Sequence, residues 1–358
     1  MKFLKQLSET PGVPGREERV RELILRETKG LWDETRTDAI GNLICLKKAG
    51  KTAAATTGTV TKKTVTVAKG TKATKVLIAC HIDEIGFYVR AIDDKGRLRL
   101  QNVGGFDTRN LFARRVCVQG RRDLLGVMNP TGRPIHMASE DEKKKIPEIS
   151  DFFVDLFLPK DQVDKLVRVG DPVTLVQEFE QIGDVVNGKC LDNRIASWVA
   201  IEAIRKVGNK SSYDIHYAAT VQEEVGCRGA GPSTLGVEPD IAIAVDTTLA
   251  CDTPGIDPVD AVTQLGKGVA IKVLDAGSIS DRALVDEFVE LAEKKKIAYQ
   301  LEILPRGSTD ASSMQRAGKG CRTITLSVPT RYIHTICESA HKDDLDAAVN
   351  LLAAWLTK

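Results

Sequence analysis

The histidines and carboxylates that follow short apolar runs are the residues of this sequence best suited to chemistry. His81 ends one such run, Asp246 ends a second, and His334 follows a third. A short apolar run is typical of a strand buried on both faces of a sheet, and α/β proteins place their ligands at the carboxyl ends of such strands. Because burying an unpaired carboxylate is costly, we interpret Asp246 as a ligand ahead of a packing residue.

Two further positions allow both a structural and a functional interpretation. Asp83 lies two residues after His81, and side chains at this spacing point the same way in an extended chain. Asp83 could therefore fix the tautomer of a metal-binding His81, although a satisfied surface histidine is the simpler interpretation of this triplet alone. Asp192 stands where a loop enters a predicted helix, so it could cap that helix or bridge two metal ions.

The adjacent carboxylates Glu223 and Glu224 follow another apolar strand and precede Gly226. Two carboxylates held together without a cation would raise the pKa of one of them, and divalent ions would remove that penalty. One of the pair could bind metal while the other faces substrate, whereas a solvated surface pair is the simpler alternative. Nitrogen and carboxylate ligands suit Zn²⁺, Co²⁺ or Mn²⁺.

Composition narrows the class of protein that carries these residues. The chain has 358 residues, 42% of them hydrophobic, and 51 basic against 49 acidic residues give a formal net charge of +2. This balance argues against a nucleic-acid or membrane-surface binder, and no apolar run approaches the ~18–20 residues that span a bilayer. The eight cysteines are spread singly, which is typical of a reducing compartment. We expect a soluble cytoplasmic protein.

The elements that must position these residues divide the chain into three parts. We expect residues 1–86 and 176–358 to form one α/β domain, with helices at 1–31, 193–207, 281–295, 309–317 and 342–357. Its later strands are expected at 215–222, 241–246, 268–274, 297–304 and 322–328. Residues 87–175 hold short strand-like pieces separated by turn residues, which predicts an inserted all-β barrel or sandwich.

A basic segment at 46–75 interrupts the first part of this domain. It contains eight lysines and no acidic residue. A solvated surface insertion, disordered or folded as a Thr/Val hairpin, is the simpler interpretation. The alternative is an electrostatic docking arm for an acidic partner.

Taken in order along the chain, these motifs resemble the M42 family of metallo-aminopeptidases, the tetrahedral and glutamyl aminopeptidases. The matching segments are His81-Ile-Asp-Glu-Ile-Gly, Leu191-Asp-Asn-Arg, Gln222-Glu-Glu-Val-Gly, Ala244-Val-Asp-Thr-Thr, Arg306-Gly-Ser-Thr-Asp and Arg331-Tyr-Ile-His. The resemblance covers nearly the whole chain. The basic segment at 46–75 is longer than the usual connection in the family.

The resemblance implies both an architecture and a set of roles. It implies a zinc-peptidase-like mixed sheet flanked by helices, with 87–175 as a PDZ-like dimerisation barrel and with dimers assembled into a dodecamer. It further implies two divalent ions per subunit, Zn²⁺ or Co²⁺ with Mn²⁺ as a further option. The roles fall as follows: His81, Asp192 and Asp246 on one ion, Asp192, Glu224 and His334 on the other, Asp83 orienting His81, and Glu223 as general base.

The function implied is removal of N-terminal residues from short peptides by a metal-activated water. A related dinuclear amidohydrolase, such as a deacylase or carboxypeptidase, is the enzymatic alternative. A non-catalytic peptide-binding protein on the same fold is the alternative from another class, and the presence of Glu223 disfavours it.

Overall fold

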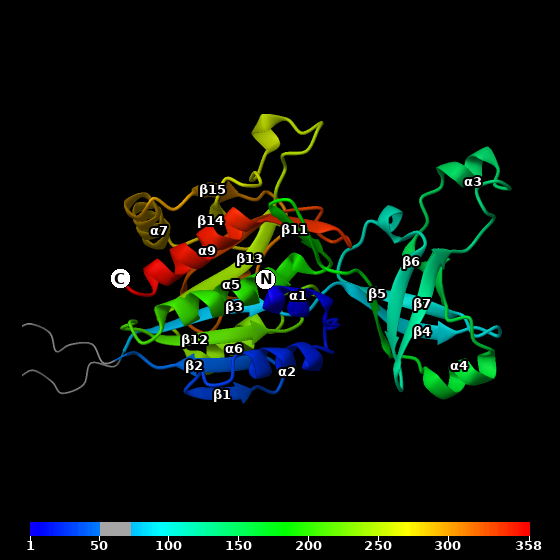
Figure 1. Cartoon of the computed structure of the whole chain (residues 1–358), viewed down its shortest axis with the longest axis horizontal. Coiled ribbons are helices and arrows are strands. Elements are labelled where there is room, and N and C mark those ends of the chain that lie inside the picture. Colours follow the sequence, from blue (N-terminus) through cyan, green and yellow to red (C-terminus); the bar gives the residue numbers. More distant parts are fainter. Residues whose placement is uncertain (51–72) are drawn as a thin grey trace, which may run out of the picture.

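The computed structural model describes residues 1–50 and 73–358. A large sheet with helices on both faces forms one part of the molecule, and a β-barrel lies to one side of it (Figure 1). The hairpin or docking arm predicted within 46–75 lies almost entirely outside the described residues.

The large sheet is mixed and has eleven strands among the described residues. Its main path runs β1-β2-β12-β3-β13-β16-β17-β11-β10, and β14 joins β16 and pairs with β15. The four central strands β12, β3, β13 and β16 are parallel to one another. The strands are β1 (Glu34–Thr37), β2 (Leu43–Lys47), β3 (Lys75–His81), β10 (Glu180–Ile182), β11 (Val185–Gly188), β12 (Asp214–Thr220), β13 (Ile241–Leu249), β14 (Val269–Leu274), β15 (Tyr299–Ile303), β16 (Arg322–Arg331) and β17 (Glu338–His341).

Helices cover both faces of this sheet because its central strands are apolar on both sides. In β3, Ile78 and Cys80 belong to one hydrophobic core and Leu77 and Ala79 to another on the opposite face. Helices α1 (Lys2–Glu9), α2 (Glu18–Glu27), α5 (Leu191–Val207), α7 (Arg282–Lys295) and α9 (Lys342–Trp355) contribute to the larger core. The smaller core lies under α6 (Ala230–Val237) and α8 (Ala311–Gln315).

The barrel is closed and all of its strand pairs are antiparallel. Its strand order is β4-β5-β8-β7-β6-β9, and alternate side chains such as Phe87 and Val89 point into its own core. Its elements are β4 (Gly86–Ile92), β5 (Leu98–Val103), η1 (Thr108–Leu111), β6 (Arg114–Gln119), β7 (Asp123–Pro130), α3 (Glu140–Lys144), η2 (Ile149–Asp151), β8 (Phe152–Asp155), α4 (Lys160–Leu166) and β9 (Pro172–Leu175). The predicted α/β sheet with an inserted β-barrel is confirmed.

The structure differs from the sequence expectation at the N-terminus. Residues 1–31 were expected to be helical, but α1 ends at Glu9 and α2 begins at Glu18. The intervening segment contains Pro11 and Pro14, which lack the amide donor that a helix interior requires. Short elements that the sequence did not predict are β1, β10, β11, β17 and α6, together with η3 (Pro258–Asp260).

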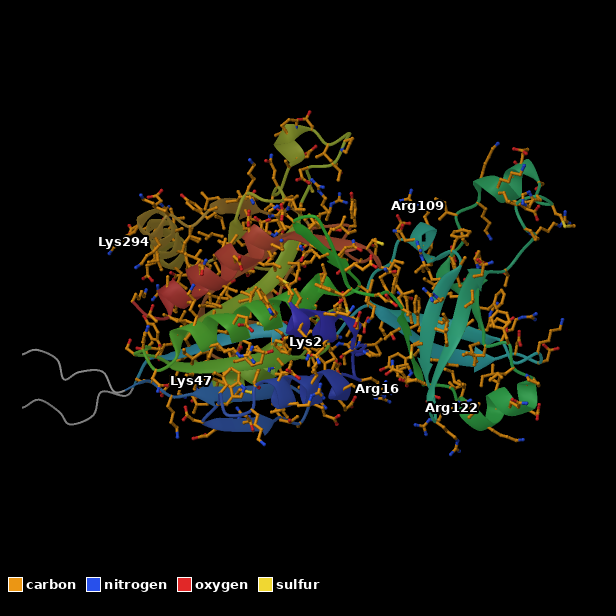
Figure 2. All side chains as sticks on the ribbon, viewed as in Figure 1. Lys2, Arg16, Lys47, Arg109, Arg122 and Lys294 are labelled. Atoms are coloured by element: carbon orange, nitrogen blue, oxygen red, sulfur yellow. The ribbon has the colours of Figure 1, made fainter. Side chains whose placement is uncertain are left out.

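Basic side chains are spread over the molecule. Arg109 and Arg122 lie on the barrel, whereas Lys2, Lys47 and Lys294 lie on elements of the large sheet and its helices (Figure 2). Among the residues that the structure describes, no helix combines the length and apolar character needed to cross a bilayer.

Candidate metal centre

The strand order explains why residues far apart in the sequence lie together. His81 ends β3 and Asp246 lies in β13, its parallel neighbour. Glu223 and Glu224 follow β12, on the other side of β3, and His334 follows β16. Since the carboxyl ends of parallel strands lie at one edge of a sheet, these side chains are gathered there. Asp192 is added from the start of α5.

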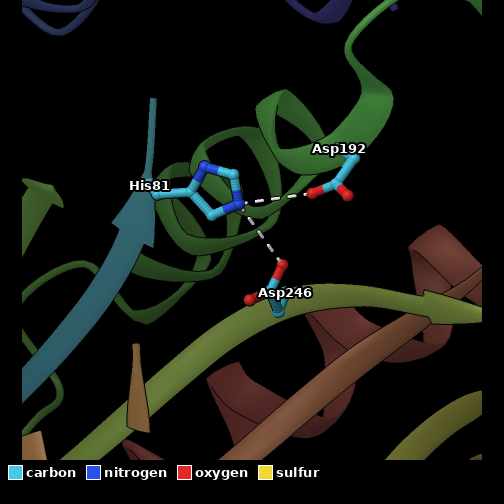
Figure 3. A group of neighbouring side chains, drawn as sticks. All are labelled: His81, Asp192 and Asp246. Carbon is cyan, nitrogen blue, oxygen red and sulfur yellow. Dashed lines mark ion pairs between the residues drawn. The ribbon is translucent and has the colours of Figure 1, made fainter. Parts of the chain in front are cut away.

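The first group of donor atoms comprises His81, Asp192 and Asp246. Nε2 of His81 lies 3.2 Å from Oδ1 of Asp192 and 3.7 Å from Oδ1 of Asp246 (Figure 3). One donor atom from each residue lies within 4.8 Å of the others, which is a spacing that a metal ion can bridge. His81 and Asp246 are buried.

The second group comprises Asp192, Glu224 and His334, again with donor atoms within 4.8 Å of one another. Nε2 of His334 lies 3.3 Å from Oε2 of Glu224 and 3.6 Å from Oδ2 of Asp192. Asp192 therefore turns Oδ1 toward the first group and Oδ2 toward the second. A carboxylate that faces two groups of donor atoms in this way could bridge two metal ions ~3.5–4 Å apart.

Asp83 and Glu338 support these groups through the backbone. The carboxylate of Asp83 accepts the backbone N–H of Glu223 and of Glu224, each at 3.0 Å, and lies 3.5 Å from Nδ1 of His81. Glu338 accepts the backbone N–H of Asp192 and of His334, each at 2.8 Å. Glu338 thus fixes two separate segments that carry donor atoms, and Asp83 fixes the segment of Glu223 and Glu224 beside His81.

Glu338 is a residue that sequence analysis missed. It lies in β17, outside every motif that drew attention, and no local signal marks it. His334 shows why such support is needed: its backbone is left-handed, with φ 64°. A residue other than glycine adopts this conformation at a cost unless the surrounding structure imposes it.

The other interpretations of the candidate residues have clear outcomes. Asp192 does not cap α5, because Cys190 occupies the N-cap position. The Asp192–Asn193 peptide bond is cis. Of the histidines judged weaker, His216 lies within β12, His341 caps α9 by accepting the backbone N–H of Asp343, and His136 is exposed in the barrel.

Packing so many ionisable groups together shifts their pKa values. Burial is the main reason that the pKa of Glu223 lies well above its ordinary range. His81 lowers this pKa, and the Asp246 carboxylate raises it. Burial also raises the pKa of Asp246 well above its usual value. Burial by itself would lower the pKa of His81, but nearby carboxylates, Glu223 foremost, outweigh it and raise that pKa. Carboxylates that repel one another in this way fit a site built for divalent cations.

A cavity of about 360 Å³ opens onto both groups of donor atoms. Its walls combine the apolar side chains of Leu249, Leu304 and Ile333 with Arg306 and buried Lys272. Lys272 is 3.0 Å from a carboxylate oxygen of Glu302, so its charge is balanced locally. The cavity is large enough to admit a side chain and the start of a peptide beside the donor atoms.

A mixed α/β sheet with nitrogen and carboxylate donors at its strand ends, beside a cavity, is an arrangement that suits an enzyme with a metal site. Comparison with known proteins identifies the family. The M42 glutamyl aminopeptidase family matches residues 63–351, and the chain therefore belongs to the M42 peptidases. It is an aminopeptidase, a peptide hydrolase, by that membership.

Three relatives match the chain over 98% or more of its length. A putative aminopeptidase of Acetivibrio thermocellus is 35% identical over 98% of this chain and 96% of its own length. A lysyl aminopeptidase of Pyrococcus furiosus is 31% identical over 99% of this chain and 96% of its own length. The TET1 peptidase of Pyrococcus horikoshii, which can assemble into a tetrahedron or a large octahedral shell, superimposes with a TM-score of 0.83 at 31% identity, covering 100% of this chain and 99% of that one.

Proposed function

We propose that this aminopeptidase removes N-terminal residues from short peptides with two divalent cations and Glu223 as general base. The observation that carries the proposal is the pair of donor groups that share Asp192 through its two oxygens. His81, Asp192 and Asp246 would hold one cation, and Asp192, Glu224 and His334 the other. Zn²⁺ or Co²⁺ suits these donors, with Mn²⁺ as a further option.

The donor set fits divalent cations on chemical grounds. In the part of the chain that the structure describes, no lysine or arginine forms an ion pair with Asp192, Glu223, Glu224 or Asp246. When bound, the cations would supply Lewis-acid activation of the attacking water and of the substrate carbonyl.

Glu223 is the carboxylate available for proton transfer. It belongs to neither of the two donor groups, although its Oε2 lies only 3.8 Å from Nε2 of His81. Its side chain lines the cavity. In our proposal Glu223 accepts a proton from the water that attacks the peptide carbonyl and passes it to the leaving amine. Asp83 holds Glu223 beside His81, because it contacts both residues.

Replacing Glu223 tests this assignment. Glu223→Gln keeps the shape of the side chain but cannot take up the proton, so we expect kcat to fall by a factor of ~10²–10⁴, the usual contribution of general acid–base catalysis. Bound metal should stay at the wild-type level, as measured by mass spectrometry of the dialysed protein. Glu180→Gln, on the exposed strand β10, is the matched control. Turnover near the wild-type rate in Glu223→Gln would show that another group is the base.

The requirement for a free amine separates this proposal from a deacylase or carboxypeptidase. We expect release of the N-terminal residue from free-amine peptides and none from their N-acetylated forms. Faster hydrolysis of the N-acetylated peptides would favour the amidohydrolase alternative. Binding of peptides without any release, in the presence of added Co²⁺ or Zn²⁺, would favour the non-catalytic alternative.

We also propose that residues 87–175 act as a dimerisation domain and that dimers assemble into a dodecamer. The tetrahedral assembly of the Pyrococcus horikoshii relative supports this. The eight cysteines are all free, which supports a cytoplasmic location. Peptides are the expected partners, with no role for nucleic acid or membrane. Light scattering should give the mass of twelve chains, and a monomer mass would contradict the assembly.

A further inference from the structure

A third group of donor atoms lies beside Glu223, outside the two groups that share Asp192. It comprises Glu223, Cys227 and Asp310, each offering one atom within 4.8 Å of the other two. Cys227 comes from the loop between β12 and α6, and Asp310 from the residue before α8. Neither Cys227 nor Asp310 has a part in the function proposed above.

The thiol of Cys227 is directed at the general base. Its Sγ donates to Oε1 of Glu223 at 3.2 Å, on the carboxylate oxygen other than the one nearest His81. Cys227 is only 6% exposed, but it is among the residues that line the cavity. A small solute that enters the cavity can therefore reach the sulfur and the Glu223 carboxylate together.

Asp310 supplies an acceptor that no described residue satisfies. The residue is 2% exposed; Oδ2 accepts the hydroxyl of Thr220, and Oδ1 has no hydrogen-bond partner among the described residues. Within residues 1–50 and 73–358, no lysine, arginine or histidine forms an ion pair with it. A buried carboxylate oxygen without a partner is costly, and a cation between Asp310, Glu223 and Cys227 would remove that cost.

We propose that Cys227, Asp310 and Glu223 form a third cation site that is selective for thiophilic divalent ions such as Zn²⁺ and Cd²⁺. Sulfur ligands favour these soft ions over Mn²⁺ or Mg²⁺, and three protein ligands leave a position for water. The thiol gives up its proton to solvent as the cation binds.

Occupation of this site inhibits the enzyme. A Glu223 carboxylate that binds a cation is no longer free to accept a proton, so excess Zn²⁺ or Cd²⁺ should stop turnover. This consequence rests on the function proposed above, whereas the binding site itself does not.

Cadmium titration of the cobalt-loaded protein tests the binding site directly. The sites that share Asp192 offer only nitrogen and oxygen, so a thiolate-to-cadmium absorption band cannot arise from them. We expect the wild type to show this band with about one extra equivalent of bound cadmium, and Cys227→Ser to lose both. Cys337→Ser removes an exposed thiol and should keep both. A band that persists in Cys227→Ser, or that the wild type lacks, would overturn the site.

Asp310→Asn provides a second variant that leaves the thiol in place. Since Asn lacks the negative charge, cadmium affinity should fall at least ~10-fold, as for losses in a metal-binding shell; unchanged affinity would remove Asp310 from the site. Inhibition is measured separately with Zn²⁺. It should be weaker in Cys227→Ser than in the wild type, and equal inhibition would refute the regulatory consequence. The band is recorded without substrate, so a protein that shows it but releases no amino acid would refute the proposed function and keep this site.

Discussion

At the residue scale, the arrangement depends on how Asp192 is held. Its two carboxylate oxygens face different histidines, and its backbone N–H is fixed by Glu338, which also fixes the backbone of His334. Burial, and then the Asp192 carboxylate, raises the pKa of Glu338 well above its ordinary value. Glu338 therefore aligns two candidate ligands, although Glu338 itself belongs to neither group of donor atoms.

Glu338→Gln should weaken metal binding without unfolding the protein. The amide still accepts one backbone N–H but cannot accept both through carboxylate oxygens, so Asp192 and His334 lose their common support. Replacing residues that orient metal ligands typically lowers affinity by ~10–100-fold, and we expect a loss in that range. Competition with a chelator measures it. Glu180→Gln is again the control, and equal affinity in the two variants would show that Glu338 has no such part.

Sequence alone predicted the candidate ligands and Asp83 beside His81, but not the support from Glu338. His81, Asp246 and His334 stood out because each ends or follows an apolar strand. Glu338 bonds to the backbone of Asp192 across 146 positions of sequence. Such a contact depends on the path of the chain between the two segments, and no spacing or residue type encodes it locally. The same holds for Asp310 and its contact with Thr220.

At the element scale, the start of α2 is tied to the loop that carries Glu223. Glu17, the N-cap residue of α2, accepts the backbone N–H of Gly15 at 2.7 Å and of Gln222 at 3.2 Å. Burial, and then the charge of Asp83, raises the pKa of Glu17 from 4.5 to about 7. The folded protein therefore holds this proton more tightly than the unfolded chain does.

This shift predicts a stability that depends on pH with a definite sign. Between pH 4.5 and 7 the folded state binds more protons at Glu17 than the unfolded state, so the free energy of unfolding falls as pH rises. The side chain of Glu17→Gln does not titrate. The free energy of unfolding of the wild type should therefore fall by roughly 2–3 kcal/mol relative to that of this variant across the range. Urea unfolding at several pH values measures the difference.

The exposed neighbour Glu18 provides the control for this experiment. Glu18→Gln should follow the wild type at every pH. A constant difference between the wild type and Glu17→Gln from acid to neutral pH would mean that Glu17 does not titrate in this range.

Elements with strong apolar patterns were predictable, and short polar ones were not. The run that became β13 is buried from Ile241 to Thr248, which gives a continuous signal. Strand β1 has the sequence Glu-Thr-Arg-Thr and is exposed throughout, so only its pairing with β2 makes it a strand. The helix expected over residues 1–31 is divided between Glu9 and Glu18, where Pro11 and Pro14 lack the amide donor of a helix interior.

At the scale of the whole molecule, the basic segment is attached far from the candidate metal centre. It begins at the end of β2 and ends at Lys75, the first residue of β3, whereas His81 is at the opposite end of β3. A strand of this length spans about 20 Å. Gly50, within the segment, donates its backbone N–H to the backbone carbonyl of Ser211 at 2.9 Å, and Ser211 precedes β12.

Removal of the middle of the basic segment should leave the chemistry intact. With residues 51–72 replaced by a short Gly/Ser linker, we expect kcat/KM for a dipeptide to stay within about twofold of wild type, because connecting loops remote from a site tolerate such changes. A steady-state assay of the purified variant measures this. A large loss of activity at unchanged metal content would show that the segment contributes to the site.

Fold class was the most predictable property at this scale. Alternating helices and strands interrupted by closely spaced strands indicated an α/β sheet with a β insertion. The position of the barrel beside the sheet was not predictable, because residues far apart in the sequence meet there. Arg19 in α2, for example, donates two hydrogen bonds to Asp123 in β7, at 2.7 and 2.8 Å. The two residues are 104 positions apart, and an exposed ion pair of this kind adds little stability by itself.

The number of metal ions bound per chain tests the shared-carboxylate arrangement most directly. Mass spectrometry of the metal-loaded, dialysed protein should give about two ions per chain for the wild type and about one for His334→Ala, as expected for two adjacent sites with separate histidines. His136→Ala, which removes an exposed histidine of the barrel, should retain both. Two ions per chain in His334→Ala, or a single ion in the wild type, would contradict the account.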